Sequence, residues 1–248
     1  MNLGLDGRTA VVCGASSGMG LAIAERLAAE GANVAMFGRR RELLEREAER
    51  IGALAVRGDV IVPGDLERLI QRTVEAFGGV DILVNNGGGP PPGPAAGLTD
   101  EAVESAVALL LLSAIRLTNL CLPHLERSGR GRIVNIESSS VRAPIDNLAL
   151  SNAIRPGVVG WAKTLARELG GSGITVNTIA PGYIDTERLR SLYAGGAPPA
   201  ESLAQIPLGR LGQPGEIADV VCFLASDRAA YVSGAVIPVD GGLTRNLL

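Results

Sequence analysis

Short apolar runs alternate along the chain with longer segments of helical character. The runs show no regular polar alternation, which is typical of strands covered on both faces of a parallel sheet. We expect strands at 9–13, 33–37, 54–57, 81–84, 132–136, 174–179 and 235–239. We expect helices at 41–50, 65–77, 101–126 and 214–224, one more ending near 30 and another ending at 169.

Strands and helices that alternate at this spacing predict right-handed βαβ crossovers. The expected fold class is α/β, a doubly wound parallel sheet (Rossmann fold) of about seven strands with helices on both faces. No repeat, linker or second unit is evident, so residues 1–248 are expected to form a single domain. Such sheets bind ligands beyond the carboxyl ends of their strands, so the loops there should carry the function.

Composition and charge exclude several classes of protein. The chain is 46% hydrophobic but only 3% aromatic, so small aliphatic side chains must fill the core, and its 33 glycines indicate many tight turns. A net charge of -3 and a sequence pI of 5.4 argue against a nucleic-acid partner. No stretch reaches the ~18 apolar residues that span a bilayer, and the start lacks the pattern of a secretory signal.

Cysteine and histidine usage points the same way. The three cysteines are odd in number and far apart, which fits neither a disulfide framework nor a metal site, and a single histidine excludes a His-rich metal centre. The sequence therefore predicts a cytoplasmic protein with no metal site, no membrane partner and no nucleic-acid partner.

The loop after the first strand has the pattern of a dinucleotide site. Its glycines let the backbone approach a pyrophosphate, and the helix that follows offers unpaired N–H groups. Glycines at such a turn can also serve tight packing alone, but the strand-loop-helix context favours phosphate binding. The predicted contacts are Gly14, Ser16, Ser17, Gly18, Met19 and Gly20.

The end of the second strand indicates which cofactor binds. A carboxylate there would bind the ribose hydroxyls of NAD and repel a 2′-phosphate. The chain instead has Arg39, Arg40 and Arg41, and guanidinium groups suit phosphate. Some of the three are expected to be solvated at the start of a surface helix. We expect NADP(H) rather than NAD(H), with Arg39 as the best candidate and Arg40 beside it.

Taken together, the motifs resemble those of the short-chain dehydrogenase/reductase family, and most of all its 3-oxoacyl-carrier-protein reductase branch. The resemblance runs from end to end of the chain. Its motifs are 14–20, Asp59-Val60, Asn85-Asn86-Gly87-Gly88, 133–136, Pro181-Gly182 with Thr186, and Val239-Asp240-Gly241-Gly242.

The resemblance implies roles for particular positions. Asp59 and Val60 would form the adenine pocket. Asn86, Gly87 and Gly88 would pass close to the adenosine ribose. The residues that would bracket the nicotinamide are Pro181, Gly182, Ile184 and Thr186. The resemblance also implies a substrate lid at about 187–207 and a homodimer or homotetramer, with the long helices that end near 126 and 169 in one interface. The substrate would be a small, apolar carbonyl compound.

The family's catalytic residues are mostly replaced in this chain. The family donates a proton from a tyrosine whose pKa is lowered by a lysine four residues later, with a serine and an asparagine in support. These four positions fall on Ser151, Arg155, Ser138 and Leu110. The single lysine, Lys163, lies two turns beyond Arg155 and cannot replace it.

We therefore expect catalysis to use Ser138, Ser151 and Arg155, although a guanidinium cannot release a proton at ordinary pH. Arg155 would also bind the cofactor ribose. Pro156 fits only the first turn of a helix, so the helix should begin later or bend at Arg155. Other candidate acids near the site are Glu137, Asp146, Ser139, Ser140 and Tyr183, although Tyr183 suits a pocket wall better.

Three functions remain open at this point. The first is an NADP(H)-dependent oxidoreductase acting on a carbonyl or alcohol, with an altered proton path. The second is a cofactor-binding protein with little redox activity, acting as a sensor or as the silent partner in a hetero-oligomer. The third is a lyase or isomerase on the same scaffold. Complete nucleotide loops favour the first two over the third, and the loss of three catalytic positions counts against the first. We still place the oxidoreductase ahead, because a cofactor site this complete favours hydride chemistry.

Overall fold

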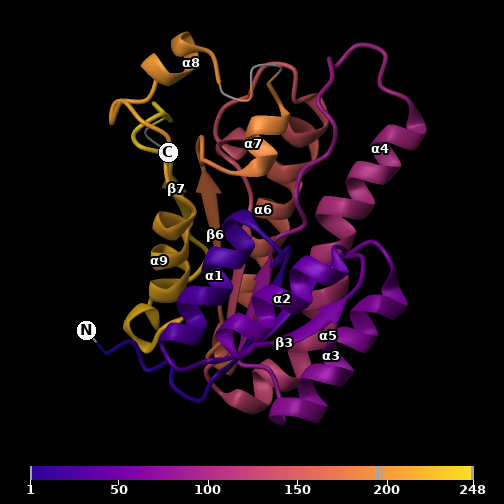
Figure 1. Cartoon of the computed structure of the whole chain (residues 1–248), viewed down its shortest axis with the longest axis vertical. Coiled ribbons are helices and arrows are strands. Elements are labelled where there is room, and N and C mark those ends of the chain that lie inside the picture. The colour runs from indigo at the N-terminus through magenta and orange to yellow at the C-terminus, as the bar shows by residue number, and fades with distance from the viewer. Residues whose placement is uncertain (1, 194–195, 197, 247–248) are drawn as a thin grey trace.

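A computed structural model describes residues 2–193, 196 and 198–246 (Figure 1). The strands are β1 (Thr9–Cys13), β2 (Asn33–Gly38), β3 (Leu54–Arg57), β4 (Ile82–Asn85), β5 (Arg132–Ile136), β6 (Thr175–Pro181) and β7 (Val236–Val239). They form one parallel sheet in the order β3-β2-β1-β4-β5-β6-β7. The predicted fold class is confirmed.

Helices cover both faces of this sheet. They are α1 (Gly18–Ala29), α2 (Arg41–Ile51), α3 (Pro63–Phe77), α4 (Asp100–Val107), α5 (Ser113–Ser128), α6 (Ala149–Leu169), α7 (Glu187–Ser191), α8 (Ala200–Ala204) and α9 (Pro214–Ala225). In Figure 1, α7 and α8 lie at the top of the molecule, above the sheet.

The strands divide the core into two layers because successive side chains point to opposite faces. Val12 of β1 packs with α1 and α9, whereas its neighbour Val11 packs with α3, α5 and α6. Both valines are fully buried. Burial on both faces explains why the strands carry apolar runs without polar alternation.

One long predicted helix is more complex than expected. The segment expected at 101–126 consists of α4 and α5, joined by a π-helical turn over Ala108–Leu112. Such turns are frequent at functional sites. Leu110, at the family's asparagine position, is buried inside this turn with 4% of its surface exposed.

The same segment, Asp100–Ser128, is long and apolar enough to span a membrane by length and composition, with a mean hydropathy of 1.8 in its most apolar window. Charged and polar residues such as Glu104 and Arg116 interrupt the segment, so it contains no unbroken run of ~18 apolar residues. Leu117, Cys121 and Leu125 of this helix are buried against the sheet. We interpret it as a core helix.

Of the two outcomes expected from Pro156, the later start of the helix was wrong. Helix α6 begins at Ala149 and continues through Pro156, which lies in its interior. The side chain of Asn152 accepts a hydrogen bond from the Ile145 N–H and donates one to the Ile145 carbonyl, so it ties the first turn to the preceding loop. This start places Ser151 and Arg155 on consecutive turns of one helix.

Candidate active site

A cavity of about 760 Å³ lies at the carboxyl ends of the strands. Its walls come from the loops after β1 to β6, the start of α1, the π-helical turn, the first turns of α6, and α7. Every residue that the sequence predicted to bind the cofactor or to take part in catalysis lines this one cavity: Gly14, Ser16, Ser17, Gly18, Met19, Gly20, Arg39, Arg40, Asp59, Val60, Asn86, Gly87, Gly88, Ser138, Ser151, Arg155, Pro181, Gly182, Ile184 and Thr186. Parallel topology explains the convergence, since all these loops leave the same edge of the sheet.

The backbone around the loop after β1 is packed so closely that only glycine fits at positions 14 and 20. Gly14 has a φ of +62°, and a Cβ there would lie 2.8 Å from the Asn86 carbonyl oxygen. A Cβ on Gly20 would overlap the Gly14 carbonyl. Asn86 holds the loop by donating a hydrogen bond to the Cys13 carbonyl at 3.2 Å.

The start of α1 is open to an anion. Its N-cap residue, Ser17, makes no side-chain capping bond, and its first turn contains no acidic residue. The first N–H groups of the helix therefore face the cavity with a favourable dipole, and the nearby Glu187 is paired with Arg40. This arrangement fits the pyrophosphate of a dinucleotide.

Arginines lie beside this cradle at the end of β2. Arg40 donates from Nε to the Ser16 hydroxyl at 3.3 Å and from Nη2 to the Ser17 hydroxyl, and its Nη1 pairs with Glu187 at 2.8 Å. Arg39 is largely exposed and lies 3.8 Å from a carboxylate oxygen of Asp59. The sequence ranked Arg39 above Arg40, whereas the structure gives Arg40 the closer contacts with the loop.

Arg155 connects the residues on the side of the cavity formed by α6 and the end of β5. Its Nε donates to the Ser151 hydroxyl at 3.0 Å, Nη1 to a Glu137 carboxylate oxygen at 3.0 Å, and Nη2 to the Gly88 carbonyl at 2.6 Å. Ser151 also contacts the Ser140 hydroxyl at 3.2 Å. The guanidinium thus joins α6, the end of β5 and the loop after β4.

Glu137 is the titratable group of this network. Burial raises its pKa to about 7, although the neighbouring Arg155 opposes that rise. The sequence placed Glu137 among several nearby acids without preferring it. Its position directly after a buried strand and before Ser138 was the available signal, because strand ends deliver their side chains to the cavity.

The other candidate acids lie elsewhere. Tyr183 lines a separate cavity of about 480 Å³ together with Pro207 and Asp240. Asp146 is exposed, and neither it nor Tyr183 contributes to the main cavity. Ser140 does not line the cavity but contacts two residues that do, through its hydroxyl to Ser151 and its N–H to Ser138. Within the described ranges, no group of His, Cys, Asp and Glu is placed to hold a metal.

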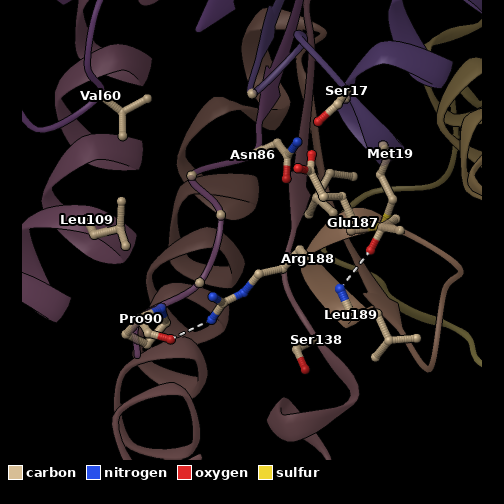
Figure 2. Close-up of a pocket in the computed structure, with 18 of the residues that line it drawn as sticks. Ser17, Met19, Val60, Asn86, Pro90, Leu109, Ser138, Glu187, Arg188 and Leu189 are labelled. Atoms are coloured by element: carbon tan, nitrogen blue, oxygen red, sulfur yellow. Dashed lines mark hydrogen bonds between the residues drawn. The ribbon is translucent and has the colours of Figure 1, made fainter. Parts of the chain in front are cut away.

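Sequence reasoning missed Arg188 of α7. It lines the cavity, and its Nη2 donates to the Pro90 carbonyl across the cleft at 2.7 Å (Figure 2). Partial burial and the nearby charge of Arg155 lower the pKa of Arg188. The apolar residues around it that the sequence did not single out are Pro90, Pro91, Leu109, Leu148, Leu189 and Leu192.

Comparisons with known proteins agree over almost the whole chain. A family model described as enoyl-(acyl carrier protein) reductase matches residues 14–244. The 3-oxoacyl-[acyl-carrier-protein] reductase FabG of Vibrio cholerae is 37% identical over 245 residues, covering 97% of this chain and 99% of that protein.

Solved structures give the same picture. L-sorbose reductase from Gluconobacter frateurii, complexed with NADPH and L-sorbose, superimposes with a TM-score of 0.93 at 32% identity and full coverage of both chains. A variant of actinorhodin polyketide ketoreductase with NADPH gives 0.91 at 34% identity, covering 96% of this chain and 98% of that one.

Proposed function

The chain belongs to the short-chain dehydrogenase/reductase family, as its motifs indicated, and we propose that it is an NADP(H)-dependent oxidoreductase acting on a small carbonyl or alcohol substrate. One observation carries the proposal: the glycine cradle, the arginines that follow β2 and the Ser138–Ser151–Arg155 group all line a single cavity. A dinucleotide held there would have its two ends at the two predicted sites.

The binding residues divide the cofactor between them. The N–H groups at the start of α1 would hold the pyrophosphate. Arg39 and Arg40 would bind the 2′-phosphate, because guanidinium groups match phosphate oxygens in geometry and charge. Asp59 and Val60 would take the adenine, and the loop after β6 the nicotinamide. When bound, NADPH supplies the hydride for carbonyl reduction.

Two serines would polarise the substrate oxygen in this proposal. Ser151 accepts a hydrogen bond from Arg155 and shares one with the Ser140 hydroxyl, so its own O–H can turn to the substrate when Ser140 is the donor. Ser138 accepts from the Ser140 N–H at 3.2 Å, which leaves its hydroxyl proton free in the same way. Arg155 supplies fixed positive charge where the carbonyl oxygen becomes negative.

Glu137 is the group we assign as the proton source. Reduction adds a hydride to the carbonyl carbon and a proton to its oxygen, and neither serine is acidic enough to release that proton at neutral pH. A carboxyl whose pKa lies near 7 can hold a proton and release it. Arg155 bridges Glu137 and Ser151, so it keeps the acid beside the two hydroxyls.

Absorbance at the reduced-nicotinamide band tests the proposal directly, with NADPH and a panel of ketones, keto esters and quinones. Consumption of NADPH that depends on substrate supports it. A flat trace from enzyme saturated with NADPH would contradict hydride transfer and leave a cofactor-binding sensor or silent partner. Failure to bind either NADPH or NADH would leave a lyase or isomerase.

The remaining proposals concern the whole chain. We propose that residues 1–248 act as a single domain with a substrate lid at about 187–207. Helices α7 and α8 lie in the lid segment. Residues 194, 195 and 197 of that segment are outside the described residues. We further propose an apolar body for the substrate, a homodimer or homotetramer, and a cytoplasmic location, which suits the three buried free cysteines.

A further inference from the structure

The charged groups lining the cavity form pairs, with one cation remaining. Arg40 pairs with Glu187 at 2.8 Å, Arg155 with Glu137 at 3.0 Å, and Arg39 lies 3.8 Å from Asp59. These are the three acidic residues on the cavity wall. Among the residues that the structure describes, Arg188 makes no ion pair.

The guanidinium of Arg188 keeps most of its donors available. An arginine has five N–H donors, and among the residues that the structure describes only the Pro90 carbonyl accepts from this guanidinium, through Nη2. The side chain remains accessible from the cavity. A cation held across a cleft with unused donors is a binding group for an anion.

Arg188 and Arg155 lie close together. The Nη2 atoms of the two residues are 3.3 Å and 3.7 Å from the point where a Cβ on Gly89 would lie. Each also donates to the loop after β4, Arg155 to Gly88 and Arg188 to Pro90. Glu137 offsets only one of these two charges. The region therefore has excess positive charge beside Ser138 and Ser151.

We propose that Arg188 binds a carboxylate on the substrate, so that the enzyme acts on oxo acids or the corresponding hydroxy acids. This inference rests on the proposed oxidoreductase function. Arg188 follows Thr186 by two residues, in the segment proposed to bracket the nicotinamide, so the anion would lie next to the reacting carbonyl. A planar guanidinium and a carboxylate form paired N–H···O bonds, which fixes the orientation of the substrate.

The apolar wall accommodates the rest of such a substrate. Leu148, Leu189 and Leu192 line the same cavity as Arg188; Leu148 caps the start of α6, Leu189 lies in α7, and Leu192 follows α7. A short aliphatic chain would pack against these leucines while its carboxylate meets the arginine. This proposal refines the substrate expected from the sequence: it would have an apolar chain and one acidic group.

Matched acids and esters test the inference by binding as well as turnover. The probes are 2-oxobutanoate, acetoacetate and levulinate with their methyl esters, titrated by calorimetry into enzyme saturated with NADP⁺. At least one acid should bind about tenfold or more tightly than its ester, as expected for a charge-assisted contact. Arg188→Met should abolish that preference and leave ester binding within about twofold.

The chain provides a matched control on the same helix. Arg190 of α7 is exposed and pairs with Asp185 at 2.8 Å, so Arg190→Met should leave both acid and ester binding unchanged. Arg188→Lys should restore part of the preference, because charge returns without the planar fork. NADPH affinity should stay within about twofold in Arg188→Met, since the anion it binds belongs to the substrate.

Three results would overturn the inference. The first is that acids bind wild-type enzyme no more tightly than their esters. The second is that Arg188→Met weakens acid and ester binding equally. The third is that Arg188→Met weakens NADPH binding, which would assign Arg188 to a cofactor phosphate. Acid binding that depends on Arg188 without NADPH consumption would support the inference and defeat hydride transfer. Ester reduction with no preference for acids would do the reverse.

Discussion

The guanidinium of Arg155 makes three contacts, to a hydroxyl, a carboxylate and a backbone carbonyl. The single ammonium of a lysine cannot reproduce this planar fork. Arg155 and Glu137 therefore form one unit: the arginine stabilises a buried carboxyl, and the carboxyl orients the arginine toward Ser151. Breaking a buried pair leaves an uncompensated charge, so substituting either residue should affect the other.

The pH dependence of reduction should report Glu137. The protonated carboxyl is the proton source, so kcat/KM for reduction should be level at low pH and fall as pH rises through about 7. Glu137→Gln should lower kcat/KM by about 10²- to 10⁴-fold and remove that fall. The control is Asp146→Asn, since Asp146 is an exposed carboxylate outside the cavity. A Gln variant that keeps the wild-type pH profile would rule out this role.

Restoring the family's tyrosine and lysine tests the Ser151 and Arg155 positions. The double variant Ser151→Tyr/Arg155→Lys supplies an acid whose ordinary pKa is ~10 together with a neighbouring ammonium that lowers it. If the site is a degenerate version of the family's site, steady-state assays with simple ketones and NADPH should show increased activity. A decrease would show that the serine and arginine are themselves the functional pair.

At the scale of elements, the regular strands and long helices were predictable from the sequence, because burial on two faces imposes continuous apolar runs. The short helix α7 was not, since it depends on a local cap: the Thr186 hydroxyl accepts from the Leu189 N–H at 3.1 Å. The π-helical turn at Ala108–Leu112 was also missed because its residues are equally compatible with an α-helix.

The positions that form the candidate site were predictable from the sequence, but the contacts between their side chains were not. Parallel topology places loop residues at one edge of the sheet, so the cofactor-loop positions could be brought together without coordinates. Contacts between distant side chains could not. Arg188 meets Pro90 across 98 positions, and Arg40 meets Glu187 across 147. No local pattern in the sequence signals such pairs.

Helix α1 offers a test of the close-packed cradle. Gly20→Ala should destabilise the protein and weaken NADPH binding, because its Cβ would overlap the Gly14 carbonyl. The matched control is Gly157→Ala in α6, where a Cβ meets nothing within 4 Å and alanine should stabilise the helix by about 0.5–1 kcal/mol. Urea unfolding and NADPH titration measure both effects. Equal stability of the two variants would contradict the packing argument.

At the scale of the whole molecule, the helix Asp100–Ser128 has apolar surface beyond what the core uses. Val103, Val107, Leu111 and Ile115 follow at four-residue spacing and stay exposed or half-buried in the isolated chain. Apolar surface of this kind is typical of an interface between subunits. It supports the proposed homo-oligomer, with this helix and α6 in the contact.

Light scattering coupled to size-exclusion chromatography tests that interface. Wild-type protein should elute as a dimer or tetramer, and Leu111→Asp should shift it toward the monomer because a buried unpaired charge is costly. Leu98 is an exposed leucine outside the helix, so Leu98→Asp should leave the assembly unchanged. A monomeric wild type would contradict the proposal.

The most direct test of the account is a fluorescence titration of the wild-type protein with NADPH and with NADH. We expect NADPH to bind about tenfold or more tightly than NADH, and the double variant Arg39→Ala/Arg40→Ala to lose that preference, since each charge-assisted phosphate contact contributes about 1.5–3 kcal/mol. Binding of neither nucleotide, or equal binding of both in wild type and variant, would contradict it.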